Sequence, residues 1–232
     1  MREKKKKDTK RLENVITVVC ILIIFASVLA FIYLHAVQKE KQGFVYAKNL
    51  DKTALEVGDE VITLKEVSYY IMVAESNYNH ASNQYGNSSL GGFWNLRINH
   101  KYFKNMAKET VRNACIRDNI YYQQARKEGY ELDDQSIAAI EEKAVEEMNR
   151  LTEEQRETTQ YGKEDMVKVL TKIEYAKTYV ALLMQQGFTE EQLDTGGEKY
   201  EEYAAAYPVV INQELWNHFS LGKTTINNKK DD

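Results

Sequence analysis

The chain has 232 residues, with one proline, 11 glycines and two cysteines. This composition excludes collagen-like and proline-rich proteins, disulfide frameworks and multi-cysteine zinc sites, and it favours long helices. Residues 1–14 carry seven basic and three acidic side chains, whereas the remainder carries 24 basic and 32 acidic ones. Because nucleic-acid-binding proteins present a basic surface, an acidic body predicts no nucleic-acid partner.

A long apolar segment follows the basic N-terminus. Residues 14–38 contain no Lys, Arg, Asp or Glu, and 20 of the 23 residues Val15–Val37 are hydrophobic. A helix of that length measures about 35 Å, which is enough to cross a bilayer core of about 30 Å. The segment therefore predicts a single transmembrane signal-anchor, Val15–Val37, through which the protein contacts the membrane.

The charges around this segment predict its orientation. By the positive-inside rule, the basic tail 1–14 is cytoplasmic and the C-terminal part is extracytoplasmic, so we expect a single-pass protein of a bacterial cell membrane. A cleaved secretory signal is the alternative, because Val28 and Ala30 resemble a cleavage site, although the apolar run is longer than a signal core. Cys20 lacks the preceding small residue of a lipidation site and is interpreted as an apolar side chain.

A mainly α domain is predicted at residues 53–221, between a linker at 38–52 and a disordered tail at 222–232. It begins with a hairpin at 54–63, where Gly58-Asp59 separates two β-prone runs. A hairpin needs a third strand for stability, and the best downstream candidate is the run 208–211, which starts with the only proline. We therefore expect the two ends of the domain to pair in a small sheet.

Apolar stripes with spacings of three and four residues predict the helices between these strands. The first begins after Thr63, with Glu66 at capping-box spacing, and reaches about Gln84. Gly129 and Gly187 are expected to end two of the later helices. These later helices are expected at 103–128, 133–151, 164–186 and 189–206.

The glycine- and serine-rich stretch 85–92 predicts a loop, which Phe93 and Trp94 follow. Large aromatic side chains beside such a loop either fold back as a lid over the core or form an adhesive surface. The lid is the favoured interpretation, because large aromatic side chains are usually buried.

The sequence offers no catalytic, cofactor or metal site. Its adjacent glutamates face different directions on a helix and are typical of a solvated surface. The histidines His80, His100 and His218 lack metal-ligand spacing. Cys115 has no neighbouring histidine or second thiol in the sequence, so we interpret it as a structural thiol. We therefore expect a protein that is not an enzyme.

Two segments carry a resemblance to a known family. The segments Leu55–Val67 (LEVGDEVITLKEV) and Ile120–Ile137 (IYYQQARKEGYELDDQSI), followed by the helix Glu164–Gln186, resemble the N-terminal chaperone region of the SurA and PrsA group. The resemblance covers about residues 53–212 and implies a helical chaperone module, exported, that binds unfolded or exported polypeptides. Members often carry a parvulin prolyl-isomerase domain, whose motifs this sequence lacks, so isomerase activity is not implied.

Two functions remain open on this basis. One is a membrane-anchored, foldase-like chaperone that presents aromatic and methionine side chains to apolar client segments. The other is a membrane-tethered scaffold or assembly subunit for one dedicated envelope protein. For each tyrosine among the candidates, the alternative is an ordinary, partly buried ring with a solvated hydroxyl. The candidate client-binding residues are Tyr69, Phe93, Trp94, Tyr102, Tyr122, Tyr175 and Tyr179.

Overall fold

The computed structural model describes residues 44–84 and 90–225, together with Val19, Ile23 and residues 25–34. The chain divides into two compact units, residues 1–44 and 45–232, and each is considered by itself. In the first unit, the described part of the predicted span Val15–Val37 is helical and its side chains are exposed. Across the described residues, no helix is both long and apolar enough to cross a membrane. The tail 1–14 and the rest of the predicted span lie outside the described residues.

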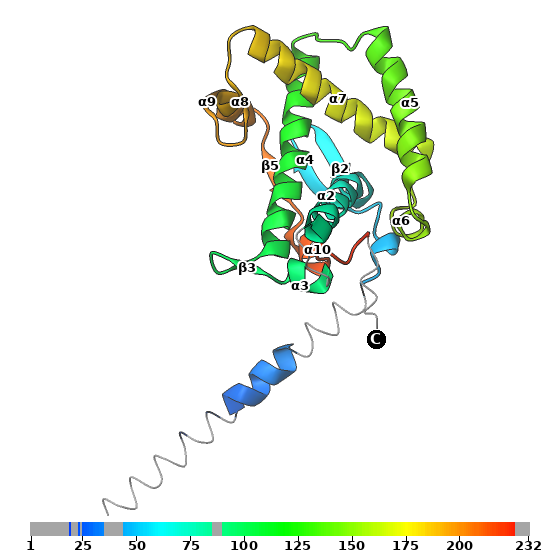
Figure 1. Ribbon diagram of the computed structural model, residues 1–232. Coiled ribbons are helices and arrows are strands. Elements are labelled where there is room, and N and C mark those ends of the chain that lie inside the picture. Colours follow the sequence, from blue (N-terminus) through cyan, green and yellow to red (C-terminus); the bar gives the residue numbers. More distant parts are fainter. Residues whose placement is uncertain (1–18, 20–22, 24, 35–43, 85–89, 226–232) are drawn as a thin grey trace, which may run out of the picture. The chain divides into compact units, whose positions relative to one another are not determined.

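The second unit is mainly helical and contains a three-stranded antiparallel sheet. Strand β1 (Thr53–Val57) lies between β2 (Glu60–Thr63) and β5 (Val209–Ile211), so Leu55 pairs with both Ile62 and Ile211. The prediction that the strand near Pro208 closes the N-terminal hairpin is confirmed. The sheet joins the two ends of the domain (Figure 1).

Gly58 shows why the hairpin turns where it does. Its φ of +56° is unfavourable for residues with a side chain, and a Cβ there would lie 2.6 Å from Oε1 of Gln123. That same Oε1 accepts a hydrogen bond from the backbone N–H of Asp59, at 3.0 Å. Gln123 belongs to helix α4 (Phe103–Lys127), so the turn is fixed against that helix.

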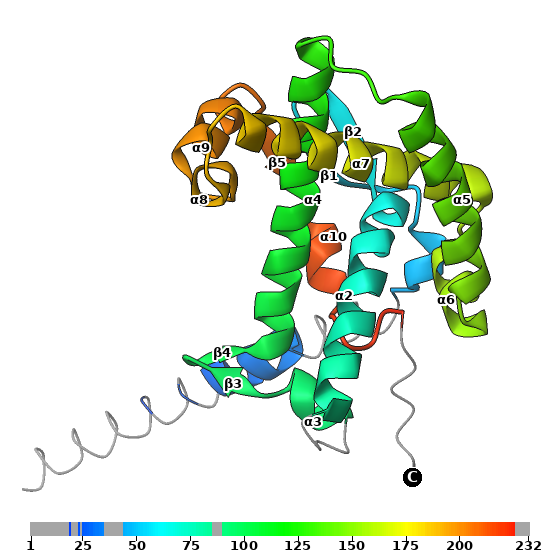
Figure 2. The same ribbon diagram turned by 45° about the horizontal axis from the view of Figure 1, so that its top comes forward.

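Three long helices occur where the apolar stripes predict them. They are α2 (Leu64–Gln84), α4 and α7 (Lys163–Gln185). Helix α7 crosses α4, and α5 (Asp134–Arg150) lies alongside α7, while α2 runs beside α4 (Figures 1 and 2). The predicted ends are confirmed at Gly129 and Gly187, which have φ values of +75° and +104°.

The capping box predicted at the start of α2 is only half present. The Oγ1 of Thr63 accepts a hydrogen bond from the N–H of Glu66, at 3.3 Å. The Glu66 carboxylate is buried and pairs with Nζ of Lys172 at 2.7 Å. Glu66 therefore contributes to the core of the domain as well as to the start of the helix.

Residues 85–89 of the predicted loop lie outside the described residues, and the chain that follows contains structure that the sequence did not predict. Helix α3 (Leu90–Trp94) is followed by β3 (Arg97–Ile98) and β4 (Lys101–Tyr102), which form a second, two-stranded hairpin. Its two turn residues, Asn99 and His100, have φ values of +49° and +67°. The sequence has no glycine at this turn, which explains why turn signals did not reveal it.

The last part of the helical region also differs from the expectation. Helix α6 (Glu153–Thr159) lies between the helices expected at 133–151 and 164–186, where no helix was predicted. The helix expected at 189–206 is broken into α8 (Glu190–Leu193) and α9 (Glu198–Ala204). Gly196 lies between them with a φ of +88°, and a Cβ on Gly197 would lie 2.2 Å from the carbonyl oxygen of Glu191. A side chain at position 197 would therefore not fit where the chain turns between α8 and α9.

The domain extends beyond both predicted boundaries. The short 3-10 helix η1 (Tyr46–Lys48) and the buried Leu50 belong to it, although they fall in the predicted linker 38–52. After β5, helix α10 (Gln213–His218) leads into a segment that is packed as far as Thr225, which is buried. The predicted tail therefore begins too early, and residues 226–232 lie outside the described residues.

Candidate functional site

A groove of about 480 Å³ lies between α2 and α4 and is reached by one side chain of α7. It opens to solvent beside the exposed residues Val73, Asn77 and Thr110. We call it the α2–α4 groove. Its apolar lining consists of Tyr69, Tyr70, Val73, Ala74 and Tyr78 of α2, Val111 and Ala114 of α4, and Ile173 of α7.

Small side chains help to explain why the space is open. Ala74 on α2 and Ala114 on α4 both lie on the apolar stripes of their helices and both line the groove. Protein interiors are normally packed to the density of organic crystals, so larger side chains would be expected there if the helices formed a closed interface. The stripes therefore have two functions: part of each packs in the core and part faces the groove.

One carboxyl group lies in the wall of this groove. Asp118 has a side chain that is only 16% exposed, and its Oδ2 accepts a hydrogen bond from the hydroxyl of Tyr70 at 3.2 Å. Burial raises the pKa of Asp118 to about 6, although Arg117, whose Nη1 lies 3.7 Å from Oδ1, opposes the shift. The groove is thus apolar with a single carboxyl group that is costly to ionise.

At its other side, the groove meets an aromatic cluster at the end of α2. The ring centroid of Tyr78 lies 4.9 Å from that of Phe103 and 5.7 Å from that of Trp94. Phe93 is half-buried and packs against both Trp94 and Phe103. Trp94 is buried, and its Nε1 donates to Oδ1 of Asn79 at 3.2 Å. The favoured interpretation, in which Phe93 and Trp94 fold back onto the core, holds for Trp94.

The C-terminal segment forms hydrogen bonds with α2 and packs against this aromatic cluster. The buried carboxylate of Glu75 accepts hydrogen bonds from the backbone N–H groups of Gly222, Thr224 and Thr225, and from the hydroxyl of Thr225. Burial raises the pKa of Glu75, while these hydrogen bonds act in the opposite direction. Gly222 has a φ of +85° and lies so close to the Trp94 ring that a Cβ would approach it to 2.4 Å.

The remaining predicted residues lie in different surroundings. Tyr175 is buried, and its hydroxyl donates to Oε2 of Glu131 at 2.8 Å. Tyr122 is half-buried and meets Tyr175 edge to face at 5.4 Å. Tyr179 is 1% exposed and belongs to the core. Tyr102 is exposed on β4.

The structure therefore does not gather the seven candidates into one surface. Among them, Tyr69 alone lines the α2–α4 groove, and it is mostly buried with its hydroxyl pKa raised to about 12 by burial and by Glu147. Six of the other groove residues lie on the apolar stripes that the sequence assigns to the core, because periodicity does not distinguish a packed position from one that faces a groove. They are Tyr70, Ala74, Tyr78, Val111, Ala114 and Ile173. No motif or spacing in the sequence indicated that Asp118 lies in a groove.

A polar cluster around Lys172 is buried between β2, α2, α4 and α7. The Nζ of Lys172 lies 2.7 Å from carboxylate oxygens of both Glu60 and Glu66, and it donates to Oδ1 of Asn119 at 3.1 Å. Burial alone would lower the pKa of Lys172, but the two carboxylates outweigh it and raise that pKa. Because its charges are paired, this cluster suits a structural function.

Other chemistry is sparse in the part of the chain that the structure describes. Cys115 is fully buried, and burial raises the pKa of its thiol well above the usual value, so a reactive thiolate is disfavoured there. Across residues 44–84 and 90–225, no group of three or more His, Cys, Asp or Glu side chains is placed to hold a metal ion.

Comparison of the chain with protein-family models, with curated proteins and with solved structures finds no match.

Proposed function

We propose that the protein is a membrane-anchored, extracytoplasmic chaperone that binds apolar segments of unfolded or exported polypeptides without catalysing proline isomerisation. The observation that supports this most directly is the α2–α4 groove, an open apolar space of about 480 Å³. Volumes of this order are typical of sites that take small molecules or a few side chains of a peptide. The anchor Val15–Val37 and the resemblance to the SurA and PrsA group stand as parts of this proposal.

The lining of the groove suits varied clients. Tyr69, Tyr70 and Tyr78 supply large amphipathic rings, which lose little conformational entropy on binding. The alanines leave room for incoming side chains of different shape. Asp118 and the Tyr70 hydroxyl provide polar atoms for hydrogen bonds with the backbone of a client. Such hydrogen bonds would offset the cost of removing the client backbone from water.

A pair of matched variants tests the groove. Val73 on α2 lines it and is 38% exposed, whereas Val145 on α5 is 45% exposed and lies outside it. We expect the full chain in lipid nanodiscs to suppress aggregation of several chemically denatured proteins, measured by light scattering. Val73→Asp should weaken suppression at least tenfold in effective concentration, because a charge enters an apolar site. Val145→Asp should have no effect.

The outcomes separate the two functions. Suppression of several unrelated clients supports the chaperone, while activity toward one envelope protein alone would favour the dedicated scaffold. Equal suppression by Val73→Asp and the unmodified chain would contradict the groove as the binding surface. In the same samples, proline isomer exchange in a test peptide should keep its uncatalysed time of tens to hundreds of seconds. Acceleration would reveal an isomerase site.

A further inference from the structure

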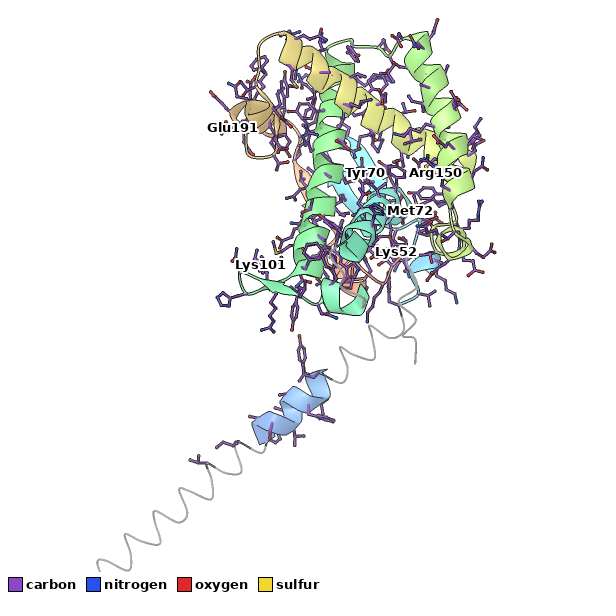
Figure 3. The ribbon with its side chains drawn as sticks, viewed as in Figure 1. Lys52, Tyr70, Met72, Lys101, Arg150 and Glu191 are labelled. Atoms are coloured by element: carbon purple, nitrogen blue, oxygen red, sulfur yellow. The ribbon has the colours of Figure 1, made fainter. Side chains whose placement is uncertain are left out.

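The β3–β4 hairpin presents apolar side chains to solvent. Residues 95–102 are all exposed, and they include Leu96 and Ile98, each 43% exposed, and Tyr102, 37% exposed. The hairpin projects from the start of α4 (Figures 1 and 2), and Figure 3 labels Lys101 on it. Ile98 and Tyr102 lie on the hairpin and Leu96 directly precedes it, and because all three side chains are exposed, they contribute little to the stability of the fold. Their exposure needs another explanation.

Cations surround these apolar side chains. The Nη2 of Arg97 donates to the hydroxyl of Tyr102 at 2.8 Å, and its Cζ lies 4.6 Å from the ring centroid. The Nζ of Lys104 lies 5.2 Å from the same centroid. Lys101 pairs across the hairpin with Ile98, and its Nζ lies 3.7 Å from Oε2 of Glu109 on α4. Ile98 and Tyr102 are therefore each next to a basic side chain.

The charge of this region is opposite to that of the domain. Residues 76–108 contain four Lys or Arg side chains and no Asp or Glu, whereas the rest of residues 45–232 contains 18 Lys or Arg and 31 Asp or Glu. An acidic domain thus contains a basic segment, which Glu109 follows directly, and the exposed apolar side chains lie within that segment. Basic residues mixed with tyrosine and aliphatic side chains are typical of surfaces that bind anionic lipid headgroups.

We propose that the β3–β4 hairpin, with Arg97, Lys101 and Lys104 around Leu96, Ile98 and Tyr102, binds the anionic surface of a lipid bilayer. A two-residue turn with four strand residues is too small for the standard protein interface of about 800 Å² per partner. A bilayer needs no such area, because shallow insertion of a few apolar side chains and attraction of the cations suffice.

The short segment between the predicted membrane anchor and the domain also favours a lipid bilayer as the partner of the hairpin. The inference rests on the proposed membrane anchor, since residues 38–44 reach at most about 25 Å when fully extended and would keep the domain close to the bilayer. The start of the domain is also near the basic segment. The Tyr46 ring lies 5.5 Å from the Phe219 ring, and Nζ of Lys108 lies 4.3 Å from that same ring.

The experiment uses the full chain in nanodiscs with an environment-sensitive fluorophore. In a Cys20→Ser background, where the remaining Cys115 is buried, His100→Cys places the label on the turn of the hairpin. Glu191→Cys on α8 places it away from the hairpin, as the labelled positions of Glu191 and Lys101 show (Figure 3). Discs of phosphatidylcholine alone are compared with discs containing phosphatidylglycerol, and contact is measured as quenching by spin-labelled lipid.

We expect quenching at position 100 in anionic discs, little in neutral discs, and none at position 191. Replacing Arg97, Lys101 and Lys104 with Gln should reduce the contact at least tenfold, since each basic residue near an anionic surface contributes about fivefold. Raising the salt concentration should have the same effect. As a control, Gln is placed at three exposed lysines outside residues 76–108, which are Lys127, Lys143 and Lys177. This triple variant should leave the quenching at position 100 unchanged.

Several results would overturn the proposal. These are the same quenching in neutral and anionic discs, an equal response to both triple variants, or contact that appears only with an added acidic polypeptide. A chain that stays in solution would count against the anchor, while the label would still report whether the hairpin binds added anionic vesicles. Val73→Asp should not alter the quenching, so failure of the groove and failure of the hairpin are distinguishable.

Discussion

Helix α4 borders two aromatic regions, one filled and one open. Toward α7 and α9, the rings of Tyr121, Tyr179, Tyr200 and Tyr203 lie within 6.1–6.4 Å of one another in four pairs, and all four residues are buried. Toward α2, tyrosines line a groove that is open. Two regions of similar composition therefore have different packing, and aromatic content by itself does not indicate a binding surface.

In the filled region, the hydroxyls of Tyr121, Tyr179 and Tyr203 have hydrogen-bond partners. The hydroxyl of Tyr121 donates to the carbonyl oxygen of Leu193 at 2.6 Å, and the hydroxyls of Tyr179 and Tyr203 are 3.3 Å apart. In the open region, the carboxyl group of Asp118 has a raised pKa. The difference indicates that the filled region stabilises the domain, whereas the groove tolerates a destabilising group.

The largest expected effect contrasts one residue from each region. Tyr121→Ala should lower the free energy of unfolding by about 3–5 kcal/mol, because it creates a cavity and leaves the Leu193 carbonyl without its donor. Val73→Ser at the groove should lower it by less than about 1 kcal/mol, because Val73 is already partly exposed. Urea denaturation of both variants measures the contrast. Equal losses would mean that the groove is as tightly packed as the tyrosine cluster.

A second large effect is expected at the buried ion pairs. Lys172→Met should lower the free energy of unfolding by about 3 kcal/mol, because the buried carboxylate of Glu66 loses its closest cation. Adding Glu66→Leu should restore part of that stability by removing the unpaired charge. The same urea titrations provide the measurement, and a double variant less stable than Lys172→Met would refute this explanation.

A moderate effect is expected where the C-terminal segment covers Trp94. Gly222→Ala should lower the free energy of unfolding by about 2 kcal/mol and shift the Trp94 emission to longer wavelength in a Trp216→Phe background. A Cβ would collide with the indole and displace the groups that Glu75 binds. Gly187→Ala is the control, since its φ is also positive but no atom lies within 4 Å of the added Cβ. Unchanged emission in the Gly222 variant would contradict the proposed packing.

The smallest expected effect depends on pH. Burial raises the pKa of Asp118 from 3.8 to about 6, so the folded state holds this proton more tightly than the unfolded state. Its stabilising contribution is complete below pH 3.8 and is lost as the pH rises through 6. Asp118→Asn should therefore be more stable than the unmodified chain by about 1 kcal/mol above pH 6, and not below pH 4. A pH-independent difference would place Asp118 in a more polar site.

Much of the fold follows from local signals in the sequence. Gly58, Gly129 and Gly187 all have positive φ values, so glycine marked the hairpin turn and the ends of α4 and α7 correctly. The closing strand was predictable because a short β-prone run followed the only proline. The β3–β4 hairpin was missed because Asn99 and His100 adopt the turn conformation without glycine.

The groove was less predictable than the fold. Ala74 and Ala114 lie on apolar stripes, and their pattern is the same whether the facing space is filled or open. Tyr175 and Tyr179 of α7 were expected to line a client surface, yet both are buried. Helices α4 and α5 pack against α7, and Tyr203 of α9 contacts Tyr179. Packing between distant segments determines these differences, and local periodicity carries no information about it.

Photo-cross-linking tests the central claim most directly. A photoreactive phenylalanine analogue is placed at Val73 in the groove or at Val145 on α5, in the full chain in nanodiscs, and each sample is irradiated with a radiolabelled unfolded client. We predict efficient cross-linking from position 73, little from position 145, and competition by excess unlabelled client. Equal cross-linking from both positions, or none from position 73 while aggregation is still suppressed, would contradict the α2–α4 groove as the client-binding surface.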